Sequence, residues 1–69
     1  YPNPAKDKVT IQGEGIQSIM MYDVSGKVIF AQKYQSEYQV EIGLKFPSGV
    51  YFLQLTGDQW SETRKLVVE

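Results

Sequence analysis

The chain has 69 residues, with seven basic and eight acidic side chains, no cysteine and no histidine. This length allows a single domain, and a domain of this size buries only about 60% of the surface that its unfolded chain exposes. Without cysteine or histidine the chain forms no disulfide, no thiolate or imidazole metal site, no cysteine nucleophile and no Ser–His–Asp triad. These absences exclude most enzymatic mechanisms, so we expect neither an enzyme nor a cofactor.

The remaining composition is typical of a folded domain and not of a disordered chain, because 42% of the residues are hydrophobic and 13% are aromatic. A net charge of −1 gives no reason to expect nucleic acid or an anionic membrane as partner. No apolar run approaches the roughly 20 residues that span a bilayer, so we expect no transmembrane segment. Because Tyr1 is not a methionine, we expect the chain to be a fragment or the processed end of a longer protein.

The first half of the chain predicts strands at residues 8–12, 16–23 and 27–34. In the first strand polar and apolar side chains alternate, with Val9 and Ile11 on one face. The second strand is apolar on both faces, as interior strands of packed sheets are. Residues 23–26, with Asp first and Gly fourth, predict a type I turn with a glycine bulge between the second and third strands.

The second half predicts strands at residues 38–42, 50–56 and 60–68. Alternation there predicts inward side chains at Tyr38, Val40, Ile42, Tyr51, Leu53, Leu55, Leu66 and Val68. No window has helical periodicity, so the predicted fold is all-β, a small antiparallel immunoglobulin-like β-sandwich. We expect one domain over residues 1–69, with residues 1–6 as an extended leading segment and residues 7–69 as the sandwich.

Carboxylates and aromatic rings are the remaining candidates for chemistry. Asp7, Asp23 and Asp58 all lie at predicted turns, and no loop carries two closely spaced aspartates of the kind that calcium requires. We therefore interpret them as turn residues and expect no metal site. Trp60 is the best candidate for an exposed sugar-stacking ring, although packing in the core or at its rim is the favoured interpretation. The lysines are too dispersed for a nucleic-acid patch.

Four motifs in order give the chain a resemblance to a known family. They are Tyr-Pro-Asn-Pro-Ala at residues 1–5 leading into Asp-Lys-Val-Thr-Ile at 7–11, Tyr-Asp-Val-Ser-Gly-Lys-Val at 22–28, Pro-Ser-Gly-Val-Tyr-Phe-Leu at 47–53 and Lys-Leu-Val-Val at 65–68. With these motifs the chain resembles the type A C-terminal sorting domains of the type IX (Por) secretion system of Bacteroidetes. Phe46 departs from the family's usual leucine, and the chain stops one residue after Val68, where members often run further.

The resemblance implies a folded secretion signal. Its cargo domain, N-terminal to it in the full-length protein, would cross the periplasm and outer membrane to the medium or the cell surface. The implied partners are the outer-membrane translocation machinery and a sortase-like peptidase, which usually removes the domain by cleavage upstream of Tyr1. The resemblance assigns recognition, or the fold that presents it, to residues that we call the recognition residues: Gly49, Tyr51, Lys65, Leu66, Val67 and Val68.

Two alternatives stay open at this point: a structural role for some of the recognition residues, and a different function for the domain. Gly49 fits a turn requirement, Leu66 and Val68 fit a core face, and the charge of Lys65 fits protection of a sheet edge against aggregation. The competing function is an immunoglobulin-like accessory module that binds carbohydrate or spaces a secreted enzyme from a surface. Both functions use the same fold, so the fold alone does not decide between them.

Overall fold

Four antiparallel strands make up the computed structural model, which describes Tyr1 and residues 4–69. They are β1 (Lys8–Tyr22), β2 (Val28–Gly43), β3 (Gly49–Thr56) and β4 (Ser61–Val68). All four belong to one sheet, in the order β2-β1-β3-β4. The predicted all-β antiparallel class is therefore confirmed, and nothing in the described part of the chain is a helix that could cross a membrane.

The strands are longer than the alternating pattern predicts. Strand β1 joins the predicted strands 8–12 and 16–23, and β2 joins 27–34 and 38–42. The alternating pattern is interrupted at each junction, at residues 13–15 in β1 and at residues 35–37 in β2. In the structure the residues at these junctions form bulges, which interrupt the ladder locally without ending the pairing of the two strands.

The bulges in β1 and β2 compensate one another. Residues 13–15 of β1 lie opposite the single residue Tyr38, and a few positions later residues 34–36 of β2 lie opposite the single residue Gln17. Because each strand has the same excess, the register on either side of the bulges is the same. The hydrophobic face of each strand therefore stays on the core side in both halves, although the strands bend between them.

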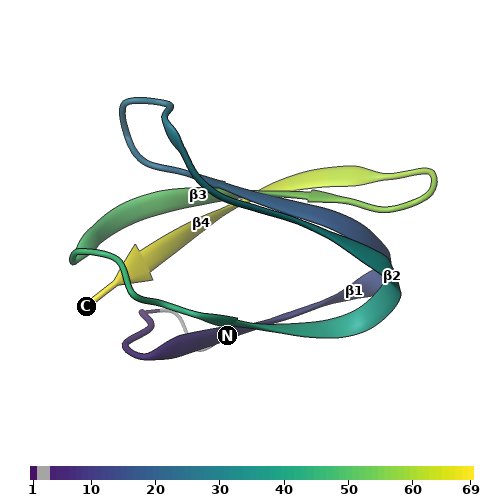
Figure 1. Ribbon diagram of the computed structural model, residues 1–69, viewed down its shortest axis with the longest axis horizontal. Helices are drawn as coiled ribbons and strands as arrows, with labels where there is room; N and C mark the ends of the chain where they lie inside the picture. Colours follow the sequence, from purple (N-terminus) through teal and green to yellow (C-terminus); the bar gives the residue numbers. More distant parts are fainter. Residues whose placement is uncertain (2–3) are drawn as a thin grey trace.

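The bulges form a corner at which the sheet folds over itself (Figure 1, right-hand side). The backbone is left-handed at Gly15 and at Ser36, each with φ of 58°. Such bulges bend a strand and increase its twist. One layer then contains β3, β4 and the adjoining halves of β1 and β2, and the opposite layer contains the other halves of β1 and β2. The two facing layers are thus parts of a single sheet.

The core fills the space between the layers. Its buried residues are Ala5, Val9, Ile11, Ile16, Ile19, Met21, Val40, Ile42, Leu44, Tyr51, Leu53, Leu55, Leu66 and Val68. The inward positions predicted from alternation are confirmed except for Tyr38, whose side chain is 71% exposed. That prediction was wrong because Tyr38 lies at the corner, opposite the β1 bulge, where the regular alternation of faces is broken.

Tyr1 and Ala5 of the leading segment bond to the backbone of β1 and of the end of β4, respectively. The Thr10 amide donates to the Tyr1 carbonyl at 2.7 Å, beside β1, and the Leu44 amide donates to the Asp7 carbonyl at 2.8 Å. Ala5 forms a parallel bridge with Val68 of β4. Pro2 and Asn3, for which an extended path is expected, lie outside the described residues.

The predicted turn between β1 and β2 is confirmed. The Gly26 amide donates to the Asp23 carbonyl at 3.0 Å, and Gly26 has a φ of 89°. The Asp23 carboxylate accepts hydrogen bonds from the Ser25 hydroxyl at 2.6 Å and from the amides of Ser25 and Lys27 at 2.9 and 3.0 Å. The Ser25 hydroxyl, followed by the Lys27 amide, holds the pKa of Asp23 below its usual value.

Candidate recognition site

The recognition residues come together at one end of the β3–β4 ladder. Gly49 pairs with Val68, Val50 with Val67, Tyr51 with Leu66 and Phe52 with Lys65. Residues far apart in the sequence are thus on consecutive rungs of one antiparallel ladder (Figure 1). The structure therefore brings the recognition residues into a single continuous site.

Alternation divides this site into an inner and an outer face. Tyr51, Leu66 and Val68 point into the core and are 6%, 2% and 3% exposed. Lys65 is exposed and Val67 is half-buried, on the opposite face of the strand. A partner that docks on the outer face can reach Lys65 and Val67, whereas the buried residues act through the position of the strand.

Tyr51 ties the ladder to the loop that precedes it. Its hydroxyl donates to the Pro47 carbonyl at 2.5 Å. Its ring is tilted at 49° to the ring of Phe46, with the two centroids 6.2 Å apart. Phe46 is therefore a packing partner of Tyr51. Gly49 follows this loop as the first residue of β3.

Ala5 completes the site from the other side of β4. Its amide donates to the Val67 carbonyl at 2.8 Å, and its own carbonyl accepts from the Glu69 amide at 2.7 Å. Its side chain is fully buried in the core. The end of β4 consequently lies between β3 and the leading segment, so its backbone is paired on both sides. Sequence reasoning did not assign Ala5 to the site, because a lone small residue between turn-forming residues has no periodicity.

Trp60 lies at the opposite end of the β3–β4 hairpin and packs against backbone. Its indole N–H donates to the Glu14 carbonyl of the β1 bulge at 2.7 Å. A Cβ atom on Gly57 would lie 2.1 Å from the indole nitrogen, so the ring is in close contact with the turn backbone. Trp60 is half-buried against the core, which supports rim packing as its role.

Two open depressions of about 410 and 370 Å³ lie beside Trp60, and both are lined by Glu14. Across Tyr1 and residues 4–69 no group of three or more acidic, histidine or cysteine side chains could hold a metal ion. The recognition residues themselves lie on a surface made of paired strands.

Comparison with known proteins identifies the family of the chain. Residues 1–69 match the family described as the secretion system C-terminal sorting domain. The chain belongs to this family. It is therefore a sorting signal of the type IX secretion system, and proteins that carry such a domain are secreted or displayed at the cell surface. A sorting-signal domain is not itself catalytic, and its role implies interaction with the secretion machinery.

A curated relative is beta-agarase A of Zobellia galactanivorans (strain DSM 12802 / CCUG 47099 / CIP 106680 / NCIMB 13871 / Dsij), which is 40% identical over 73 residues. The match covers 100% of this chain and 13% of the agarase. No solved structure matches the chain significantly. The resemblance inferred from the sequence motifs is confirmed at the level of the family.

Proposed function

We propose that the outer-membrane translocation machinery recognises this domain at the end of the β3–β4 ladder where Gly49 pairs with Val68. The observation that carries the proposal is the pairing of Gly49 with Val68 and Tyr51 with Leu66, which collects the recognition residues on adjacent rungs. A cargo domain precedes Tyr1 in the full-length protein. After export, a sortase-like peptidase cleaves the chain upstream of Tyr1.

The recognition residues have two roles in this proposal. Lys65 and Val67, on the outer face of β4, touch the machinery. Gly49, Tyr51, Leu66 and Val68 hold β4 in place beneath them, because they pair with or pack under the same strand. A basic and an aliphatic side chain side by side suit a partner surface with an acidic group next to an apolar pocket.

Truncation of residues 65–69 is a poor test of this recognition site, because it removes the proposed contact residues together with buried side chains of the core. Leu66 and Val68 are nearly fully buried, and burial of each such side chain contributes about 1.5–3 kcal/mol. Their loss is comparable to the whole stability of a small domain, which is of the order of 5 kcal/mol. Failure of export after truncation would not distinguish loss of the signal from loss of the fold.

Point variants of the outer face separate signal from fold. The domain is fused to a periplasmic reporter in a host with the type IX system, and the surface-exposed fraction of the reporter is measured. We expect Lys65→Gln and Val67→Thr to reduce export at least several-fold while the thermal unfolding midpoint stays within a few degrees of the parent. Lys27→Gln is the matched control, since it removes the same charge from the exposed β1–β2 turn, outside β4.

The outcomes have clear meanings. Normal export of the Lys65→Gln, Val67→Thr double variant would overturn the recognition site, because both outer-face side chains would then be dispensable. Normal export by the parent fusion is required before either variant is interpreted. Mass spectrometry of the released reporter tests the cleavage step: we expect the new C-terminus to lie upstream of Tyr1. Retention of the complete domain on the mature reporter would contradict cleavage and would fit an accessory module.

A further inference from the structure

Strand β2 is the edge of the sheet on one flank of the molecule. It stands first in the strand order, and among the described residues only β1 pairs with it. Because β2 turns the corner, its two halves form the edges of both layers (Figure 1). The edge at β4 is different, since its C-terminal end is paired with Ala5. A long unpaired edge is a template for pairing with another strand.

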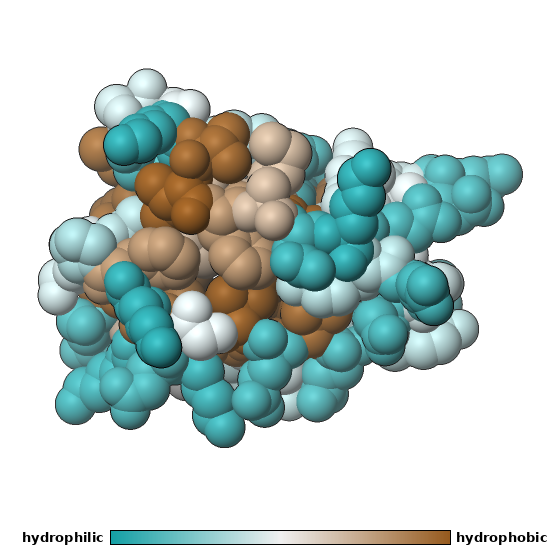
Figure 2. Space-filling view, viewed as in Figure 1, coloured by the Kyte–Doolittle hydropathy of each residue, from teal (hydrophilic) through white to brown (hydrophobic). Residues whose placement is uncertain are grey.

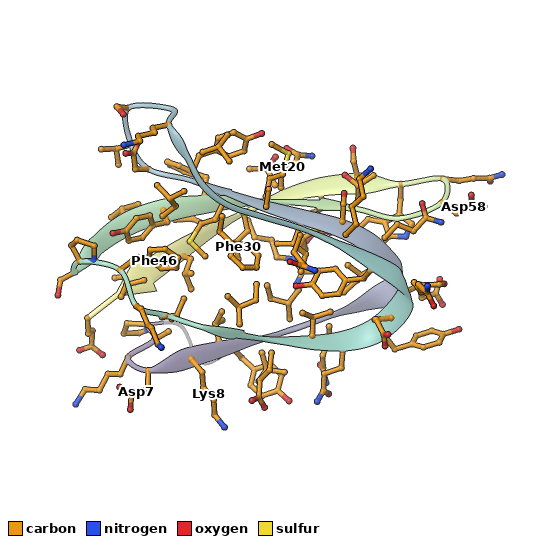
Figure 3. All side chains as sticks on the ribbon, in the orientation of Figure 1. Asp7, Lys8, Met20, Phe30, Phe46 and Asp58 are labelled. Carbon is orange, nitrogen blue, oxygen red and sulfur yellow. The ribbon has the colours of Figure 1, made fainter. Side chains whose placement is uncertain are left out.

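The flank along β2 is also apolar. Ile29, Phe30, Tyr34 and Phe46 pack against the core but are only half-buried, and Val28 is 42% exposed. Figure 3 shows Phe30 and Phe46 in the space between the two layers, on the side where the edges of β2 face the viewer. Figure 2 shows an apolar surface in the middle of this face, bordered by hydrophilic residues. Such bordered apolar patches mark protein interfaces.

Charge is distributed along β2 in a self-complementary way. Lys33 is the only charged residue of β2 before the corner, and Glu37 and Glu41 are the only ones after it. The Glu41 carboxylate lies 3.6 Å from the Lys8 ammonium of the same copy. We therefore take Glu37 as the carboxylate of β2 that pairs with a lysine from another copy. Lys33 and Glu37 flank the bulge at Ser36 on opposite sides.

We propose that this flank binds a second copy of the chain, with the two β2 strands antiparallel about a two-fold axis at the corner. An antiparallel pair places the half of β2 before the corner along the half after the corner in the partner. Lys33 of each copy then faces Glu37 of the other, so both pairs form by one symmetry operation, as in an isologous interface. Short ladders form on either side of the bulge.

The fold gives this arrangement a structural reason. In one copy the layer that contains β3 and β4 is wider than the layer made from the remaining halves of β1 and β2. The two-fold axis joins the narrow layer of one copy to the wide layer of the other, so both layers become continuous across the dimer. The half-buried rings between the layers then lose their remaining contact with water. A standard interface needs about 800 Å² per partner, a minor share of the 4573 Å² surface of this chain.

Sedimentation analysis of the 69-residue chain over a range of concentrations tests the proposal. We expect a reversible monomer–dimer equilibrium. Lys33→Glu alone and Glu37→Lys alone each create two like-charge contacts, and we expect each to weaken dimerisation about tenfold. The double variant Lys33→Glu, Glu37→Lys restores opposite charges, and we expect its dissociation constant to return to within about threefold of the parent. Thermal unfolding checks that each variant is folded.

Hydrogen exchange locates the interface independently of the charges. We expect amides of Val28–Gly43 to gain protection as the concentration rises, while those of Ser61–Val68 do not change. A chain that stays monomeric at millimolar concentration would overturn the proposal. Dimers that are unaffected by both single variants, or that protect β4 instead of β2, would also overturn it. Export does not enter this test, so its outcome is independent of the recognition site.

Discussion

Gly15 and Ser36 face each other across the corner of the sheet with the same left-handed backbone, each at φ of 58°. A Cβ atom on Gly15 would lie 3.0 Å from the Ser36 hydroxyl oxygen. One bulge uses glycine, which adopts this conformation freely, and the other uses serine, for which it carries strain. Both residues lie in the bulges at which the single sheet turns from one layer into the other.

Gly15→Ala is expected to destabilise the domain by about 1–2 kcal/mol, the typical cost of a left-handed conformation for a residue with a Cβ. Ser36→Gly removes the same strain but increases the entropy of the unfolded chain, so we expect a gain of up to about 1 kcal/mol. Chemical denaturation measures both. Gly43→Ala is the control, because a Cβ there meets nothing within 4 Å. Equal effects of Gly15→Ala and Gly43→Ala would contradict the importance of the corner.

The sequence predicts most of the strand content but not the corner. Alternation located the buried faces of the strands, because one face of each layer packs against the core and the other is exposed to solvent. Two-residue periodicity does not distinguish a bulge from a turn, since glycine serves both. Residues 13–15 therefore predicted the end of a strand, and the burial of Tyr38 was predicted wrongly.

The recognition site was predictable only in part. Its members came from motif resemblance, and the strand predictions placed them in two separate strands. Their positions on adjacent rungs follow from the β3–β4 register, which the short turn at residues 57–60 fixes. Ala5 was not assigned to this site, and Glu14 was not identified as the partner of Trp60, because their hydrogen bonds are made by backbone groups, which are the same in every residue.

Gly57→Ala is expected to displace the indole of Trp60, because the new Cβ would lie 2.1–2.8 Å from three ring atoms. The ring would lose its hydrogen bond to the Glu14 carbonyl and part of its packing, at a cost of about 2–3 kcal/mol. Trp60 is the only tryptophan, so a red shift of the fluorescence reports its exposure. In a Trp60→Ala background the cost of Gly57→Ala should largely disappear; an unchanged cost would assign it to the turn backbone.

Tyr51→Phe is expected to cost about 1 kcal/mol, because it removes the donor to the Pro47 carbonyl and keeps the ring against Phe46. For a domain of this size that corresponds to a decrease of about 4–8 °C in the unfolding midpoint. Calorimetry measures the change, and the reporter fusion measures export at a temperature where the variant is folded. Tyr51 is buried, so we expect export there to be normal; a severe defect would place the hydroxyl in direct contact with the machinery.

Ala5→Leu is expected to destabilise the domain by about 1–3 kcal/mol, since the larger side chain does not fit at a fully buried position. The bridge to β4 should open, and the amide of Glu69 should exchange faster because it loses the Ala5 carbonyl. Lys6→Leu is the neighbouring control at an exposed position, with an expected change within about 0.5 kcal/mol. Slow exchange at Glu69 in the Ala5→Leu variant would show that the bridge does not depend on Ala5 packing.

Acid should weaken the β1–β2 turn through Asp23. Hydrogen bonds from the Ser25 hydroxyl and the Lys27 amide lower the pKa of Asp23 in the folded state, so its carboxylate stabilises the fold above its ordinary pKa of about 3.9. That contribution is lost as the pH falls below this value through the folded-state pKa, because the unfolded chain takes up the proton first. Asp23→Asn should therefore flatten the acid side of the curve of unfolding midpoint against pH. Asp58→Asn, which removes the same charge from the exposed β3–β4 turn, measures the effect of net charge alone. Identical acid-side slopes in the two variants would mean that Asp23 has no specific role in the turn.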